Sequence, residues 1–76
     1  MGDTPHELRE EFPDHVERLH ALKVSDVRAA RIMDEYHDLN REIHRIETNI
    51  TPASDETLED LKKNRLKLKD EIAAML

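Results

Sequence analysis

The chain lacks several residue types on which common protein chemistries depend. Its 76 residues include no cysteine and no tryptophan, a single glycine, and only Phe12 and Tyr36 as aromatic residues. The lack of cysteine excludes disulfide bonds and thiolate metal sites. With Gly2 as the one glycine, a glycine-rich phosphate-binding loop is excluded as well. The scarcity of aromatic residues also removes the stacking platform that single-stranded nucleic acids need.

Long hydrophobic runs and excess positive charge are missing too. No apolar stretch approaches the roughly 20 residues that span a bilayer, and the acidic, polar segment 1–10 does not resemble a signal peptide. We therefore expect a soluble, cytoplasmic protein without membrane contact. The formal net charge of −6 argues against general binding of nucleic acid, because such binding relies on neutralising phosphates.

Charged residues and strong helix formers dominate the chain. Charged residues make up 39% and hydrophobic residues 37% of it, and leucine, alanine, glutamate and lysine are frequent. This composition favours long helices with narrow apolar stripes, and the length suits one domain. We predict an all-α fold and a single helical-hairpin domain over residues 1–76, in which residues 1–12 form an acidic, partly ordered N-terminal arm.

Apolar residues alternately three and four positions apart predict two long helices. The first is expected over about 26–48, with Ser25 as its N-cap and Asn49 in its C-cap. The second is expected over about 55–75, with Ser54 as its N-cap. This alternation is the heptad pattern that places apolar side chains on one seam of each helix. The predicted seam consists of Ala29, Ile32, Tyr36, Leu39, Ile43, Ile46, Leu58, Leu61, Leu68, Ile72 and Met75.

The short connection between these helices makes them antiparallel neighbours, so we predict an antiparallel coiled-coil hairpin. A short helix over about 13–22 is expected to precede it, because Pro13 would interrupt a longer one. Residues 23–25 are expected to form the bend between them. Residues 4–7 match a capping box and could begin a further helical turn.

A two-helix hairpin of this size has a thin core, so its remaining apolar residues must be buried against a further helix or another chain. Two solutions are open. The first helix can fold back onto the hairpin as a third helix, or two chains can pair about a two-fold axis into a dimeric helical bundle. We favour the dimer. The candidate partner face consists of Phe12, Val16, Leu19, Leu22, Leu66 and Leu76.

A basic cluster in the last helix offers a second functional interpretation. It could dock RNA, DNA or an acidic protein, but a solvated helix face neutralised by neighbouring carboxylates is the interpretation we favour. Arg65 also interrupts the apolar seam, and we expect its head to reach solvent or a carboxylate. The cluster consists of Lys62, Lys63, Arg65, Lys67 and Lys69.

Catalytic and metal-binding chemistry is not expected. No two of the five histidines are three or four residues apart, the spacing that lets a helix present a pair to one ion. A catalytic carboxylate pair needs a cleft that shifts one pKa relative to the other, and we expect a thin helical bundle to offer no such cleft. We predict no enzymatic activity, no cofactor and no bound metal.

The segment 61–76, with 34–39 and 42–47, resembles the YdcH-like family of small bacterial proteins. Upstream residues between 12 and 23 fit the same pattern, and the most specific part is the Lys-Leu-Lys-Asp-Glu-Ile run at 67–72. The resemblance implies a helical, coiled-coil-like hairpin of unknown function, and it adds no chemistry.

Our leading functional hypothesis is a protein–protein interaction and oligomerisation module. It would be a homo-oligomer that presents helix faces to an unidentified protein partner. The alternative is a small nucleic-acid-associated regulator that uses the basic cluster.

Overall fold

The computed structural model describes residues 6–48 and 50–76. Every regular element in these two ranges is a helix, which confirms the predicted all-α fold. The order of elements along the chain is α1 (Leu8–Glu11), η1 (Pro13–His15), α2 (Val16–Ser25), α3 (Val27–Glu47) and α4 (Asp55–Met75).

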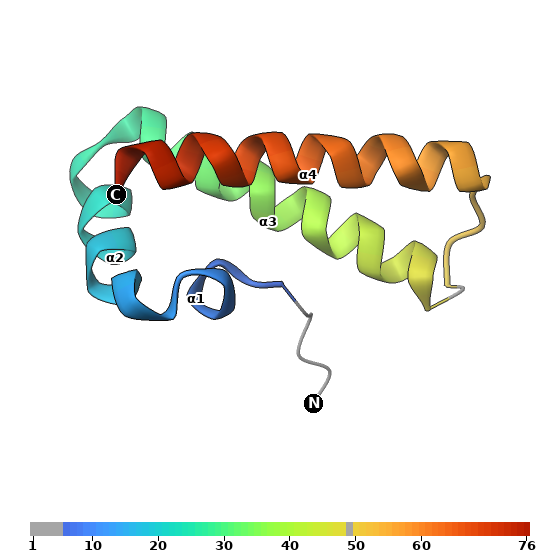
Figure 1. Ribbon diagram of the computed structural model, residues 1–76, viewed down its shortest axis with the longest axis horizontal. Coiled ribbons are helices and arrows are strands. Elements are labelled where there is room, and N and C mark those ends of the chain that lie inside the picture. The colour runs from blue at the N-terminus through green and yellow to red at the C-terminus, as the bar shows by residue number, and fades with distance from the viewer. Residues whose placement is uncertain (1–5, 49) are drawn as a thin grey trace.

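Helices α3 and α4 form the predicted hairpin and dominate the molecule. They run in opposite directions, and α3 lies obliquely to α4 (Figure 1). Both helices begin and end within one residue of their predicted limits. The N-cap of α4 is confirmed, because the hydroxyl of Ser54 accepts a hydrogen bond of 3.1 Å from the backbone N–H of Thr57. Asn49, the predicted C-cap residue of α3, lies outside the described residues.

The junction between α2 and α3 differs from the prediction. Ser25 is not the N-cap of α3; α2 continues through it, and its hydroxyl donates to the carbonyl of Ala21 at 2.7 Å. Asp26 caps α3 instead, because its Oδ1 accepts from the backbone N–H groups of Arg28 at 2.9 Å and Ala29 at 3.2 Å. A carboxylate satisfies two orphan donors here and also complements the positive end of the helix dipole. The predicted three-residue bend is therefore wrong, and the turn is made at Asp26 alone.

The predicted helix over 13–22 is divided and displaced. Pro13 begins the single turn η1, and α2 follows from Val16 to Ser25. The break agrees with the limited place that proline has in a helix. Upstream, α1 begins after Glu7, whose side chain makes no capping hydrogen bond. Thr4, the first residue of the predicted capping box, lies outside the described residues.

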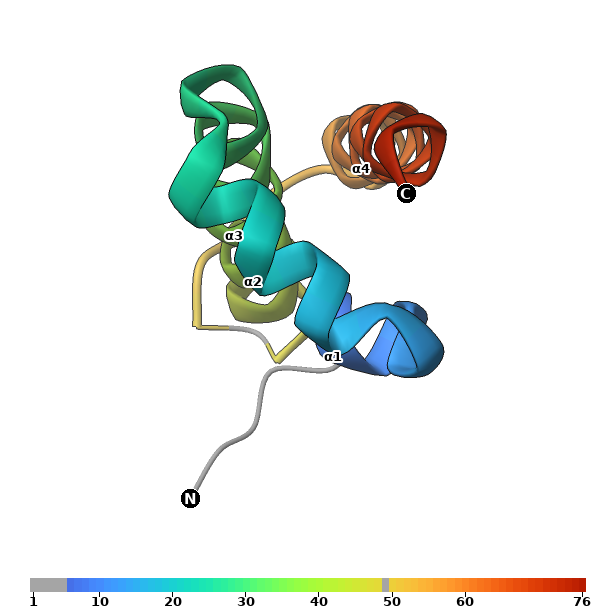
Figure 2. The ribbon, with the colours of Figure 1, turned by 90° about the vertical axis from the view of Figure 1, so that its left-hand side faces the viewer.

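The N-terminal helices fold back onto one end of the hairpin. Figure 2 shows α2 leading from the start of α3 to α1, so that these helices lie beside the hairpin as a further layer. The structure therefore shows the fold-back arrangement within one chain, and the dimer stays a prediction. The main core cluster consists of Leu19, Ala29, Ile32, Met33, Tyr36 and Ile72. Half-buried residues packed against it are Leu8, Phe12, Leu22, Leu68, Met75 and Leu76.

In the part of the chain that the structure describes, the loop end of the hairpin has two layers. Ile43 and Ile46 of α3 are buried there, outside the main cluster, while Leu58 and Leu61 of α4 are half-buried. None of the helices in the described ranges has both the length and the hydropathy that crossing a membrane requires.

Candidate functional site

The seam residues predicted from the heptad pattern lie along the inner faces of α3 and α4, at two levels of burial. The buried ones are Ala29, Ile32, Tyr36, Ile43, Ile46 and Ile72. The half-buried ones are Leu39, Leu58, Leu61, Leu68 and Met75. Met33 and Asn40 are buried as well, although the strict pattern omits them.

A polar pair interrupts the apolar contact between α3 and α4. Asn40 is only 1% exposed, and its Oδ1 accepts a hydrogen bond of 3.0 Å from Nη1 of Arg65. In place of the expected carboxylate, Nη1 of Arg65 therefore has a buried amide as its partner, and the residue as a whole is half-buried. The sequence did carry a signal for Asn40. A cation on one seam needs a polar group on the other, and Asn40 directly follows the predicted seam residue Leu39.

The basic cluster does not form one continuous surface. Arg65 points inward to Asn40, while Nζ of Lys62 lies 3.4 Å from a carboxylate oxygen of Glu47 on α3. Nζ of Lys69 lies 3.4 Å from a carboxylate oxygen of Glu11 on α1. Three of the five members of the cluster thus contact neighbouring helices, and Lys63 and Lys67 belong to the opposite side of α4.

That opposite side carries a shallow depression of about 510 Å³, which we call the outer strip of α4. Leu66 lies within it and is 58% exposed. Within residues 6–48 and 50–76, the charged side chains of the strip form no ion pair within 4 Å. The strip consists of Lys63, Leu66, Lys67, Asp70, Glu71 and Ala74.

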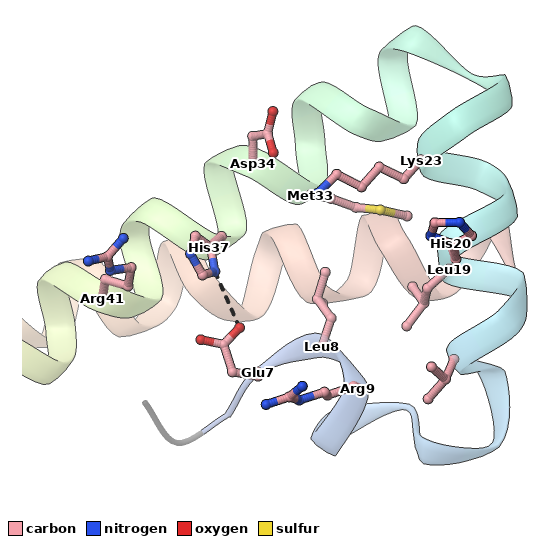
Figure 3. A pocket seen from close by; sticks show the side chains of 11 residues that line it. Glu7, Leu8, Arg9, Leu19, His20, Lys23, Met33, Asp34, His37 and Arg41 are labelled. Carbon is pink, nitrogen blue, oxygen red and sulfur yellow. Dashed lines mark hydrogen bonds and ion pairs between the residues drawn. The ribbon is translucent and has the colours of Figure 1, made fainter. Parts of the chain in front are cut away.

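A larger hollow, which we call the N-terminal groove, lies among α1, α2 and α3 (Figure 3). It is open to solvent and has a volume of about 780 Å³. The sequence did not predict this hollow, which the folded-back N-terminal helices leave beside α3. The lining residues are Glu7, Leu8, Arg9, Val16, Leu19, His20, Lys23, Met33, Asp34, His37 and Arg41.

Two polar contacts fasten the beginning of the described chain to α3. The hydroxyl of Tyr36 donates a hydrogen bond of 2.6 Å to the carbonyl of His6, and Nδ1 of His37 lies 3.3 Å from Oε2 of Glu7. The Tyr36 side chain is fully buried, so its hydroxyl needs a partner, and the backbone of His6 supplies one. These contacts join residues that are 30 positions apart, which local sequence patterns do not reveal.

Glu11 completes this attachment by joining α1 to α4. Its Oε1 lies 3.1 Å from Nδ1 of His6 and 3.4 Å from Nζ of Lys69. Burial acts to raise the pKa of Glu11, but the hydrogen bond with His6 and the charge of Lys69 outweigh burial and lower it. Burial, together with the negative charge of Glu11, raises the pKa of Tyr36 to about 12.

The floor of the groove is apolar. Leu19 of α2 and Met33 of α3 are buried, Leu8 of α1 is half-buried, and all three side chains converge on the hollow (Figure 3). Val16 forms part of the wall and is 47% exposed. The floor therefore offers an apolar contact surface that belongs to three different helices.

The rim of the groove is mainly cationic. Arg9, Lys23 and Arg41 have no carboxylate within 4 Å among the residues that the structure describes. Of the two acidic lining residues, Glu7 is engaged with His37, and Asp34 points away from the floor (Figure 3). With histidines neutral, three cations and two carboxylates give the lining a net charge of +1, in a chain of net charge −6.

The polar side chains that line the groove are charged groups and histidines. No serine, threonine or cysteine is among its lining residues, so it offers no hydroxyl or thiol group. His37 and Glu7 are close enough to interact, yet both are partly exposed and both lie at the rim. Within the described ranges, no three histidine, aspartate or glutamate residues are grouped so that they could hold a metal ion.

The candidate partner face is largely used inside the chain. Leu19 belongs to the main core cluster. Phe12, Leu22 and Leu76 pack against that cluster. Val16 and Leu66 are the exposed members, one in the wall of the N-terminal groove and the other in the outer strip of α4. The two hollows therefore hold the apolar residues of this face that the fold leaves uncovered.

Comparison with known proteins identifies the family of the chain but does not indicate an activity. No curated protein and no solved structure matches the chain. The family model described as a protein of unknown function (DUF465) matches residues 30–76, which cover all of α4 and most of α3. The resemblance to YdcH-like proteins is thereby confirmed, and the chain belongs to the DUF465 family.

Proposed function

We propose that this protein is a helical interaction module without enzymatic activity, and that it pairs with a second copy of itself through the outer strip of α4. The observation that carries the proposal is the exposure of Leu66 among charges of both signs that form no ion pair with any described residue. Large exposed apolar residues bordered by polar ones are typical of interaction surfaces.

The order of the charges along the strip is self-complementary. Lys63 and Lys67 come first along α4, and Asp70 and Glu71 follow. When two such strips lie antiparallel about a two-fold axis, the cations of each copy face the carboxylates of the other. The same pairing brings the two copies of Leu66 close to the axis. A parallel arrangement would instead place like charges opposite each other.

The division of apolar residues within the chain also supports pairing. The inner face of α4 is occupied by α3 and by the N-terminal helices, and Leu66 on the outer face stays exposed among the described residues. A domain of 76 residues buries only about 60% of the surface of its unfolded chain, so covering one more leucine per copy is a substantial gain. Complete burial of a leucine contributes about 1.5–3 kcal/mol.

The alternative of a nucleic-acid-associated regulator has less support. Such a protein needs a continuous cationic surface, and Lys62, Arg65 and Lys69 are directed to partners on α1 and α3. The cations that remain on the outer side of α4, Lys63 and Lys67, lie beside two carboxylates.

Sedimentation equilibrium of charge-reversed variants tests the proposal. We expect the wild-type protein to dimerise reversibly in the micromolar range. The single changes Lys63→Glu and Asp70→Lys should each weaken dimerisation about tenfold, because like charges then meet across the axis. Combining the two in one chain should restore dimerisation, since each new glutamate then faces a new lysine on the other copy.

Two exposed residues on α3 provide matched controls. Arg31→Glu and Asp38→Lys make the same changes of charge outside the strip, and we expect both to leave dimerisation unchanged. A wild-type protein that remains monomeric at several hundred micromolar would overturn the proposal. A double variant that associates no better than its two parents would overturn the antiparallel pairing.

A further inference from the structure

We infer that the N-terminal groove is a second binding site, and that it takes an acidic amphipathic segment of another protein. This inference does not depend on the proposed dimer, because the groove and the outer strip of α4 share no lining residue. It assigns a partner chemistry to the hollow among α1, α2 and α3.

The shape of the groove favours a segment of polypeptide. Its volume of about 780 Å³ falls in the range of ligand sites, but it is an open trough bounded by three helices and does not enclose its contents. Leu8, Leu19 and Met33 present apolar surface at the centre of this trough. A helix that carries one or two apolar side chains can lay them into such a groove, as amphipathic helices do in general.

The placement of the cations defines the charge of that segment. Arg41 of α3 lies toward one end of the groove, Arg9 lies on α1 beside Leu8, and Lys23 of α2 extends along Met33 (Figure 3). The cations therefore surround the apolar floor. The complementary segment has apolar residues that face the floor and carboxylates on either side of them.

The cations of the groove are available to a partner. Arg9, Lys23 and Arg41 are exposed, and within the described part of the chain none of them forms an ion pair. By contrast, Lys62 and Lys69 of α4 each have a carboxylate within 4 Å. Unpaired cations beside an apolar floor, in a chain of net charge −6, steer acidic partners to this face in preference to the rest of the surface.

A protein segment fits these observations better than nucleic acid. The carboxylates of Glu7 and Asp34 repel a continuous phosphate backbone, and the groove has no aromatic residue on which bases could stack. The apolar floor, in turn, would have no partner in a phosphate chain.

A peptide-display selection tests the inference without knowledge of the natural partner. A phage library of random 16-residue peptides is selected against the folded full-length protein and counter-selected against the double variant Lys23→Glu/Arg41→Glu. We expect the enriched peptides to be rich in aspartate and glutamate and to carry apolar residues three or four positions apart. Fluorescence anisotropy of the best peptides should show binding at least about tenfold weaker to the double variant. Binding should also weaken as salt is added.

Three controls keep the outcome decisive. Arg28→Glu/Arg31→Glu makes the same change of charge on exposed residues of α3 outside the groove, and it should bind the peptides like the wild type. Circular dichroism verifies that each variant is folded, and the milder Lys23→Gln/Arg41→Gln replaces the reversal if it is not. Amide chemical shifts should change around Leu8, Leu19 and Met33 when a peptide is added.

Several results would overturn the inference. These are enrichment of peptides without excess carboxylates, equal losses of binding in the groove and control variants, and a selection that yields no groove-dependent peptide. Tighter binding of a single-stranded oligonucleotide through the same cations would reject a protein partner in favour of nucleic acid. Each result leaves the sedimentation test of the dimer unaffected, so the two proposals fail separately.

Discussion

The two ends of the α3–α4 hairpin solve the problem of a thin core in different ways. At the end near the C-terminus, α1 and α2 add a further layer, and Tyr36 and Ile72 are completely buried in the main cluster. At the loop end only two helices meet, and Leu58 and Leu61 are half-buried. Ile50, just beyond α3, is 72% exposed.

The comparison shows what a third layer contributes to a hairpin with one apolar stripe per helix. When the apolar stripe of one helix packs against that of the other, the residues at the centre of the contact, such as Ile43, are buried. The leucines that flank the contact stay partly exposed. A third layer covers the flank as well, which is why Met33 is buried although the strict heptad pattern omits it. We therefore expect the free energy of unfolding to be concentrated at the three-layer end.

The largest effect is expected from shortening a core side chain at the three-layer end. Ile72→Ala should lower the free energy of unfolding by about 2–5 kcal/mol, because it leaves a cavity in a fully packed cluster. Leu61→Ala at the two-layer end should cost about 1–2 kcal/mol, because this side chain is already partly hydrated. Urea unfolding followed by circular dichroism measures both. Equal losses of unfolding free energy in the two variants would show that the two ends of the hairpin contribute equally to stability.

The next effect concerns Tyr36 at high pH. Its pKa is raised above the ordinary value of 10 to about 12 in the folded protein, so the unfolded chain loses this proton first as pH rises. The contribution to stability is complete below pH 10 and is lost between pH 10 and about 12, with a total of about 3 kcal/mol. Tyr36 is the chain's one tyrosine, so its ultraviolet absorbance reports this titration directly.

Tyr36→Phe is the control for that titration. It removes the ionisable hydroxyl and its hydrogen bond to the carbonyl of His6, at a cost of about 1 kcal/mol at neutral pH. Between pH 10 and 12 the variant should lose less stability than the wild type. A Tyr36 that titrates near pH 10 in the folded protein would show that its hydroxyl is not buried.

A smaller effect is expected from the polar pair in the middle of the hairpin. Asn40→Ala removes the acceptor of the Arg65 hydrogen bond from a buried position, and should cost about 1–3 kcal/mol in urea unfolding. Asn64→Ala is the matched change at an exposed position of α4, and we expect it to be neutral or slightly stabilising. An Asn40→Ala variant as stable as Asn64→Ala would mean that this hydrogen bond contributes nothing.

The smallest effect is expected from Glu11. Because its pKa lies below the ordinary value of 4.5 in the folded protein, its contribution to stability is present above pH 4.5 and is lost as pH falls through the folded pKa. Glu11→Gln should lower stability slightly at pH 7 and flatten the acid side of the pH–stability profile, measured by thermal unfolding. A pH–stability profile identical to that of the wild type would show that Glu11 does not help to hold α1 against the hairpin.

The sequence predicted the hairpin well because its signals are local. Heptad spacing and the cap at Ser54 act within a few residues, and they place both long helices almost correctly. The cap of α3 was misassigned because Ser25 and Asp26 are adjacent and both can cap; the carboxylate prevails by accepting two N–H groups.

The candidate sites were less predictable because they depend on contacts between distant residues. The N-terminal groove exists because His6 and Glu7 reach Tyr36 and His37, 30 positions further along the chain. The basic cluster looks continuous in sequence, yet the twist of α4 directs Lys62 and Lys69 to one side and Lys63 and Lys67 to the other. Helical periodicity by itself predicts that separation, since residues 62, 65 and 69 share one face and residues 63 and 67 form a neighbouring strip.

Native-state hydrogen exchange of α3 tests most directly whether the folded-back helices make the two ends of the hairpin different. Tyr36 and Ile43 lie on the same helix and both have completely buried side chains, but only Tyr36 is covered by the third layer. The account predicts that the amide of Tyr36 exchanges at least about tenfold more slowly than that of Ile43. Equal rates, or slower exchange at Ile43, would contradict it.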